Sequence, residues 1–401
     1  MNKGIYKYTF IAPLLLLFGS CKKPYTPAVI TSGTNYLVVE GSINTGADST
    51  IIHLTHTIPL SSPSGTVSPP ELNATVTVES DANATYPLSE IGNGYYASAG
   101  LNLSSANKYK LKIITTGNKI YESDFVPVKN SPPIDSVSYQ VETTDLRINV
   151  STHDASNNTR YYRWDYDETW IIHSKYDSQL KLITYPVDSI VLRPASEQIY
   201  TCWQSQVSSD IVLGSTAKIT NDILTNYPVT VIPSTSEKLA ERYSILVKQY
   251  AMTPDAFNYY QELRKNTESL GTIFDPQPSS LTGNIHCTTN PSEQVIGYIT
   301  AGSVSKVRIF VDARNLPANA NWIPSQPQFD CDFEETVYNP DPLGVHPYSV
   351  KEYLYTGILI PIQPLQLPGA AHPIGYTGAS PICVDCTLRG VNKPPAFWTN
   401  E

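Results

Sequence analysis

The sequence predicts a mainly β protein: an N-terminal immunoglobulin-like β-sandwich followed by a larger β-rich domain with one inserted α-helix, at about residues 253–270. Three observations predict this fold class. The chain has 27 Tyr and 32 Pro but only 2 Met among its 401 residues, a composition that favours strands and turns over helical bundles. Short runs of period-two hydrophobic alternation fill the region before residue 130. One segment stands out because it carries both the start and the stop signals of a helix.

The first 20 residues form a predicted signal peptide. Lys3 and Lys7 precede an apolar run at 10–18, which is shorter than the roughly 20 residues that a bilayer span needs. Two small residues then lead into Cys21, a pattern that resembles the lipobox of bacterial lipoproteins. The resemblance implies cleavage before Cys21 and a diacylglycerol on its thiol. The alternative is an ordinary cleaved secretory signal followed by a chance cysteine.

A lipid on Cys21 would tether the protein to a membrane, which we expect to be the outer membrane. Each methylene of an acyl chain that is buried in the bilayer contributes about 0.8 kcal/mol to membrane binding, so two or more chains anchor a protein stably. Residues 21–35 are rich in Pro, Thr, Ser and Gly and read as a tether. Acidic residues after the cysteine are common in surface-exported lipoproteins, but Lys22 and Lys23 follow here. Both the periplasmic and the surface-facing orientation therefore stay open.

Residues 36–128 are predicted to form the immunoglobulin-like sandwich. The clearest strand is "KYKLKI", in which Tyr109, Leu111 and Ile113 point one way and lysines the other. Seven short strand candidates within about 90 residues are typical of such a sandwich. We expect these strands at 36–43, 50–57, 73–79, 85–89, 95–98, 108–115 and 119–126.

The proline pair in "KNSPPIDS" at 129–136 marks the predicted boundary of the second domain, 134–401. In its strand "RYYRWDYDETW", Tyr162, Trp164 and Tyr166 share one face, and Arg163 and Asp165 take the other. Further strands are expected at 244–250, 294–300 and 306–312, and 167–242 reads as one or more large insertions.

The expected helix begins with Thr253 as its N-cap and Pro254 in its first position, and Gly271 closes it.

With Cys21 lipidated, five cysteines remain, and an exported protein can form disulfides. Our preferred bridge joins Cys331 to Cys383 or to Cys386, because all three lie in the C-terminal quarter. The spacing of Cys383 and Cys386 also suits zinc or redox chemistry. However, a second C-x-x-C for zinc and a βαβ setting for a redox pair are both missing, so a structural disulfide is favoured.

Three longer segments carry a resemblance to a known family: "ERYSILVKQYAMTPDAFNYYQELRKNTESLGTIFDPQPSSLTGNIH", "NPSEQVIGYITAGSVSKVRIFV" and "CVDCTLRGVNKPPAFW". They resemble Bacteroidota envelope lipoproteins of domain-of-unknown-function family 4249, across nearly all of the mature chain. The resemblance implies no catalytic mechanism. Because many such proteins are encoded beside TonB-dependent outer-membrane receptors, it implies a partner of that kind, a β-barrel receptor.

The sequence names no catalytic residue, no metal ligand and no cofactor. The usual hydrolase and nucleotide motifs are absent, and a net charge of −9 argues against nucleic acid. His53 and His56 would lie on opposite faces of a strand, and His286 would diverge from Cys287. Asp165 and Asp167 share a strand face, which leaves a hydrolase of glycans or peptides as an alternative function.

Four tryptophans are candidates for contact with a ligand or partner, since exposed aromatic side chains often anchor interfaces. They are Trp164, Trp170, Trp203 and Trp398, the last beside Phe397. Packing in a sandwich core is the alternative for each. The sequence thus predicts a lipid-anchored cell-envelope protein, a non-enzymatic binding or accessory subunit of a TonB-dependent uptake system. The other alternative is a structural or adhesive surface protein.

Overall fold

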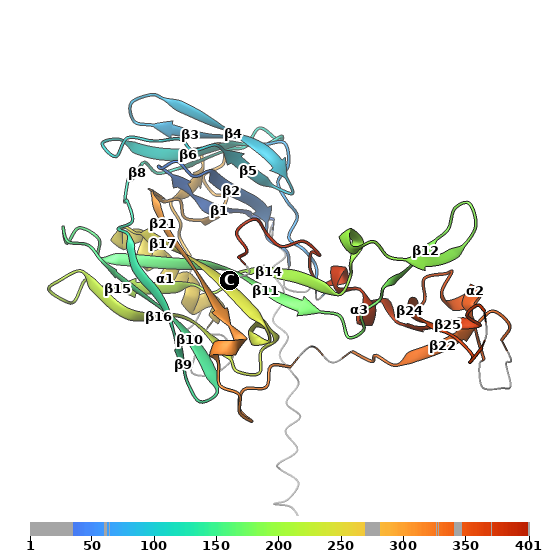
Figure 1. Cartoon of the computed structure of the whole chain (residues 1–401). Helices are drawn as coiled ribbons and strands as arrows, with labels where there is room; N and C mark the ends of the chain where they lie inside the picture. The colour runs from blue at the N-terminus through green and yellow to red at the C-terminus, as the bar shows by residue number, and fades with distance from the viewer. Residues whose placement is uncertain are drawn as a thin grey trace, which may run out of the picture.

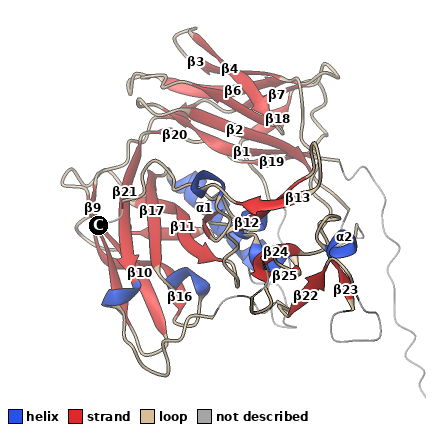
Figure 2. Ribbon diagram, turned by 45° about the vertical axis from the view of Figure 1, so that its right-hand side comes forward, coloured by secondary structure: helices blue, strands red, loops and turns tan. Residues whose placement is uncertain are grey.

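The computed structural model describes residues 35–59, 62–63, 65–268, 281–325, 327, 329–340, 347–369 and 371–399. The predicted signal peptide, Cys21 and nearly all of the tether lie outside this range. The described chain is mainly β, as predicted, and forms three lobes (Figures 1 and 2). We call them the N-terminal sandwich, the central sandwich and the distal lobe.

The N-terminal sandwich has the two layers expected of an immunoglobulin-like fold. One layer contains β1 (Leu37–Asn44), β2 (Thr50–His56) and β5 (Tyr95–Ser98). The other contains β4 (Thr85–Gly92), β3 (Thr75–Ser80), β6 (Lys108–Ile114) and β7 (Ile120–Ser123), with β8 (Val126–Pro127) beside β6. Strand β4 pairs with both β3 and β5 and so connects the layers. Tyr109, Leu111 and Ile113 of β6 are buried, which confirms the predicted alternation.

The predicted limits of this sandwich, 36–128, were incomplete. Strand β18 (Ile285–Cys287) pairs with β7, while β19 (Val295–Gly297) and β20 (Ala301–Gly302) pair in parallel with β1. These strands lie between α1 and β21 of the central sandwich in sequence, and pairing across such a separation leaves no local pattern. The backbones approach closely at Gly297, where φ is +149° and a Cβ would lie 2.3 Å from the carbonyl oxygen of Val39.

The central sandwich stacks two further sheets. The smaller sheet is β16 (Ile223–Pro233), β10 (Asp145–His153) and β9 (Ile134–Val141). The larger is β14 (Thr201–Val207), β11 (Tyr161–His173), β17 (Arg242–Ala251) and β21 (Val304–Asp312), with β15 (Val212–Ser215) also on β11. As predicted, Tyr162, Trp164 and Tyr166 face one way, into the core between the sheets. We call this the inner face of the larger sheet.

The predicted helix is α1 (Pro254–Glu268), and it packs against the opposite, outer face of the same sheet. The backbone N–H of Ala256 donates to Oγ1 of Thr253, the predicted N-cap, over 3.2 Å. Ala256 and Phe257 contact Tyr161, whose side chain faces away from the central core.

The distal lobe combines one insertion of the central sandwich with the C-terminal part of the chain. Its sheet has the order β23 (Tyr348–Ser349), β22 (Phe333–Val337), β25 (Gly375–Ala379) and β24 (Ile360–Leu365). The hairpin β12 (Leu180–Ile183) and β13 (Ser189–Leu192) lies within the region predicted as an insertion. The lobe also holds two short helices, α2 (Val350–Tyr353) and α3 (Pro381–Val384). Figure 1 shows it projecting to one side of the two sandwiches.

Candidate functional site

Two cavities lie near the end of β11, and the smaller one is lined in part by a short 3-10 helix, η2 (Glu237–Leu239). We call the larger one the junction cavity, because it lies between the central sandwich and the distal lobe. We call the smaller one the polar cleft, and it opens between the two sheets of the central sandwich.

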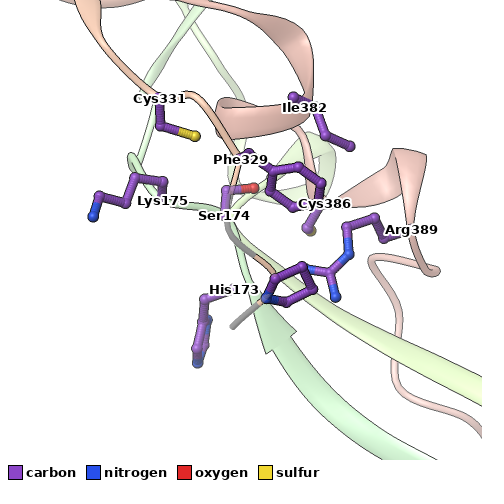
Figure 3. A pocket seen from close by; sticks show the side chains of 9 residues that line it. His173, Ser174, Lys175, Phe329, Cys331, Ile382, Cys386 and Arg389 are labelled. Atoms are coloured by element: carbon purple, nitrogen blue, oxygen red, sulfur yellow. The ribbon is translucent and has the colours of Figure 1, made fainter. Parts of the chain in front are cut away.

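The junction cavity has a volume of about 410 Å³ (Figure 3). Its lining residues come from the end of β11, the segment before β22 and the C-terminal region: His173, Ser174, Lys175, Pro327, Phe329, Cys331, Ile382, Cys386 and Arg389. Two of its three basic side chains are already paired with carboxylates. Nε2 of His173 lies 2.6 Å from Oε2 of Glu241, and the guanidinium of Arg389 donates to Glu237. Arg389 also lies 5.6 Å from the ring centre of Phe329.

Both disulfides of the described chain border this cavity. Cys331 is joined to Cys383 within the distal lobe, one of the two pairings that the sequence favoured. Cys386 is joined instead to Cys202 of β14, so the C-x-x-C pair is not bonded to itself. Cys287 forms no disulfide and is buried in the N-terminal sandwich. The Cys202–Cys386 bridge therefore ties the distal lobe to the central sandwich, and the Cys331–Cys383 bridge links two segments of the distal lobe beside the cavity.

The polar cleft has a volume of about 240 Å³. Its lining groups are mostly hydroxyls, amides and charges: Tyr166, Glu168, Gln206, Ser208, Ser209, Asp210, Thr230, Val231, Ile232, Pro233, Ser236 and Lys238. They lie on β11 and the end of β14 from the larger sheet, on β16 from the smaller sheet, and on η2.

Glu168 is the buried charge at the back of the polar cleft, with its side chain 4% exposed. It lies on the inner face because it follows the same alternation as Tyr162, Trp164 and Tyr166 along β11. Oε2 of Glu168 lies 2.6 Å from Nζ of Lys238, and Oε1 accepts from the hydroxyl of Tyr243 over 2.8 Å. Burial and the adjacent Glu168 charge raise the pKa of Tyr243 well above its usual value, so that it stays a donor.

A second carboxylate, Asp210, lies at the open side of the cleft. The hydroxyl of Tyr166 donates to Oδ2 of Asp210 over 2.9 Å and lies 3.1 Å from Oγ1 of Thr230. Burial, together with Asp210, raises the pKa of Tyr166 above its usual value. The cleft therefore holds one buried and one exposed carboxylate, each bound by a neutral tyrosine.

Lys238 also lies 5.0 Å from the ring centre of Trp170, a cation–π contact. Two buried polar atoms beside it, Nε1 of Trp170 and Oε1 of Gln204, have no hydrogen-bond partner among the described residues. Buried donors and acceptors are rarely left unpaired in proteins. This end of the inner face is therefore polar, in contrast to the packed core around Trp164.

The four candidate tryptophans do not form one surface. Trp164 is fully buried, and Trp170 is 5% exposed. Their strand positions place both on the inner face of the larger sheet, so the core packing given as the alternative is observed for these two. Contact of these tryptophans with a ligand stays a prediction. Trp203 and Trp398 pack edge to face at 6.2 Å, where the C-terminal tail returns to β14 through the pairing of Val391 with Trp203.

The other candidates from the sequence are dispersed. Asp165 is paired with Arg163 at 3.0 Å and Asp167 with Lys248 at 2.7 Å, away from the polar cleft. His53 and His56 contact different carboxylates, those of Glu40 and Glu71. His286 is exposed while Cys287 is buried, which is the divergence expected in a strand.

Glu168 is a functional candidate that was not among the residues predicted from the sequence. The prediction concerned only its neighbours Asp165 and Asp167, which share the other face of the same strand. The alternation that places Trp164 and Tyr166 in the core also places Glu168 there. A carboxylate predicted to lie on a buried face is unusual, and this would have indicated Glu168 from the sequence.

Within the described ranges, no helix is both long enough and apolar enough to cross a membrane. No group of three or more His, Cys, Asp or Glu side chains there is arranged to hold a metal ion.

No curated protein matches the chain. A family model, described as a domain of unknown function (DUF4249), matches residues 22–308. This range covers the N-terminal sandwich and the central sandwich as far as β21, and most of the distal lobe lies beyond it. Because the match spans more than half of the sequence, the chain belongs to the DUF4249 family.

Proposed function

We propose that the protein is a lipid-anchored, exported binding protein of the cell envelope, and that it acts as an accessory subunit of a TonB-dependent outer-membrane uptake system. The pair of disulfides is the observation that carries the exported location. Disulfides persist in oxidising compartments and are rare in the cytosol. The N-terminal pattern ending at Cys21 supports the anchor, and the association with a receptor rests on the family resemblance.

Binding fits the arrangement of the lobes. The N-terminal sandwich follows the tether, and a cavity lined in part by Phe125 and Tyr298 lies at its border with the central sandwich. The polar cleft and the junction cavity lie further along the chain, in the central sandwich and at the distal lobe. The anchored end and the binding end are then separate parts of the molecule.

The anchor is tested with a Cys21→Ser variant. Cells are labelled with an alkyne fatty acid, and the protein is then partitioned between detergent and aqueous phases. We expect the parent protein to carry the label and enter the detergent phase, and the variant to do neither. Cys287→Ala is the matched control and should behave as the parent. Unlabelled parent protein would overturn the anchor.

The receptor role is tested by pull-down of the tagged full chain from native membranes after mild crosslinking. We expect a β-barrel receptor of the TonB-dependent class among the recovered proteins. Repeated recovery of the protein without any such barrel would overturn the accessory role.

A further inference from the structure

The polar cleft has properties that point to one class of ligand, which goes beyond the proposed envelope role. We propose that the cleft binds a neutral, polyhydroxylated molecule of about one sugar ring. The proposal rests on the preorganised back wall, the charge balance, the mixed hydrogen-bonding groups and the size of the cleft.

The back wall of the cleft is held in one arrangement. Glu168 accepts from Tyr243 on one oxygen and from Lys238 on the other, at 2.8 and 2.6 Å. An ionised carboxylate has about four lone-pair positions, so each oxygen keeps capacity for one more donor. A ligand hydroxyl can use that capacity without rearranging the buried pair, which keeps the ordering cost of binding low.

The charge of the cleft selects against anions. Its two carboxylates, Glu168 and Asp210, face a single ammonium group, that of Lys238, among the lining residues. Lys238 is already bound to Glu168, and Asp210 is exposed at the open side. A phosphate or carboxylate ligand would meet like charge on entry, which disfavours it.

The remaining lining groups both donate and accept. Gln206 offers an amide, and Ser208 and Ser209 offer hydroxyls, along one side of the cleft. The opposite side carries Val231, 52% exposed, and Pro233, both on β16. In a sugar ring, the hydroxyls at the edge can bond to the polar side of the cleft, and the C–H groups on one face can pack against Val231 and Pro233.

The volume of about 240 Å³ lies just below the range of roughly 300–1,000 Å³ that is typical of pockets for drug-sized ligands. A single ring can be held there, while a longer chain would have to extend beyond the cleft.

The test is isothermal titration calorimetry on the purified full chain in a detergent without a sugar headgroup. The probes are glucose, galactose, mannose and N-acetylglucosamine, with sodium glucuronate as the anionic analogue of glucose. We expect at least one neutral sugar to bind with a Kd on the order of 1 mM, and glucuronate to bind more weakly than glucose.

The diagnostic variant is Gln206→Ala with Asp210→Ala, since both side chains are exposed and their loss spares the core. It should weaken the neutral sugar by about tenfold, the effect of losing one or two hydrogen bonds. The matched control is Gln140→Ala with Asp188→Ala, an exposed pair outside the cleft, which should bind as the parent.

The proposal is overturned if no neutral sugar binds, if glucuronate binds more tightly than glucose, or if the diagnostic and control variants bind alike. None of these results affects recovery of the receptor by pull-down, so failure of this proposal can be distinguished from failure of the proposed function.

Discussion

The two sandwiches share an architecture but have different interiors. The N-terminal core is built mainly from Val, Ile and Leu, and its buried polar residues are Ser, Thr and two Asn, Asn44 and Asn284. The central core holds large aromatic side chains, and the two acidic residues that are fully buried in the described chain, Glu168 and Asp222, both lie there. Asp222 accepts from Tyr162 at 2.8 Å and from Thr216 at 2.6 Å.

This difference suits the two sandwiches to different roles: the N-terminal core contributes stability, and the central core positions polar groups. An aliphatic core is stabilised in proportion to the apolar area that it buries and tolerates repacking. A buried polar network adds little net stability, but each member fixes the orientation of its partners. Nε1 of Trp164 donates to Gln249, and Gln249 in turn donates to Thr152 in the facing sheet. The central sandwich therefore gains less stability from its buried polar groups than from apolar packing, but these groups are fixed in orientation, as a binding cleft requires.

The largest expected effect follows from the Cys202–Cys386 bridge, because it spans 184 residues and no disulfide of the described chain lies in the N-terminal sandwich. Replacing both cysteines by Ser should lower the stability of the central sandwich and distal lobe by up to about 5 kcal/mol. Hydrogen exchange followed by mass spectrometry should show faster exchange in β11 and β14 and none of this change in β3 and β6.

Removing the Cys331–Cys383 bridge, which spans 52 residues, serves as the control and should loosen the distal lobe alone. Equal loss of protection in both sandwiches after removal of Cys202–Cys386 would contradict the view that they are separately stabilised.

The Trp164→Ala variant should cost the central sandwich about 4 kcal/mol, because it leaves a large cavity and takes the donor away from Gln249. Leu111→Ala is the N-terminal counterpart and should cost about 3 kcal/mol. All five tryptophans lie after residue 134, so Trp fluorescence during urea unfolding follows the later lobes, while circular dichroism follows both sandwiches. Trp164→Ala should therefore shift the unfolding transition seen by fluorescence. If it shifted only a transition seen by circular dichroism and not by fluorescence, Trp164 would not stabilise the central sandwich as described.

The Glu168→Gln variant should cost about 3 kcal/mol, because it leaves the ammonium group of Lys238 half-buried without its partner charge. Adding Lys238→Met should recover most of this loss. In the N-terminal sandwich, Glu122→Gln next to Lys110 should cost about 1 kcal/mol or less, since that pair is partly exposed. Chemical denaturation of these three variants measures the costs, and equal costs at the Glu168 and Glu122 pairs would contradict the difference between the two sandwiches.

The smallest expected effect is on acid stability. Burial raises the pKa of Asp154, but hydrogen bonds from Ser156 and Thr159 outweigh it and lower the pKa to about 2. Because the folded pKa lies below the ordinary value of 3.8, this stabilisation is present above about pH 4 and is lost as the pH falls toward 2. The Asp154→Ala variant should show a shallower loss of stability between pH 4 and pH 2. A slope identical to that of the parent would assign the acid sensitivity to other groups.

Local patterns predicted much of the fold. The strand expected at 108–115 is β6 (Lys108–Ile114), and the helix expected at 253–270 is α1 (Pro254–Glu268), with the predicted cap residue in place. Alternation and capping depend on neighbouring residues, so they can be seen in a sequence. Strand β9 was not predicted, because its run follows a proline pair and contains Asp and Ser, although its partner β10 is the next strand in the chain. The sheet of the distal lobe was not predicted either, because its strands are short and β22 pairs with β25, about 40 residues further along the chain.

The candidate site was predicted less well for a related reason. Asp165 and Asp167 were visible as a carboxylate pair, but their face of β11 lies outside the cleft and each has a cationic partner. Glu168 and Asp210 line the cleft instead. Glu168 lies on β11 and Asp210 lies between β14 and β15, so the pairing of both strands with β11 brings the two residues together, and β16 of the smaller sheet supplies the facing wall.

The sequence by itself determined the fold class and the inward face of β11, because these follow from composition and from the period of the hydrophobic pattern. Only the tertiary structure decided that Cys386 bonds Cys202, that residues 285–302 complete the first sandwich, and that Glu168 meets Lys238 in a cleft. These are contacts between segments far apart in the chain, and they are selected by the free energy of packing the whole chain rather than by any preference of its local segments.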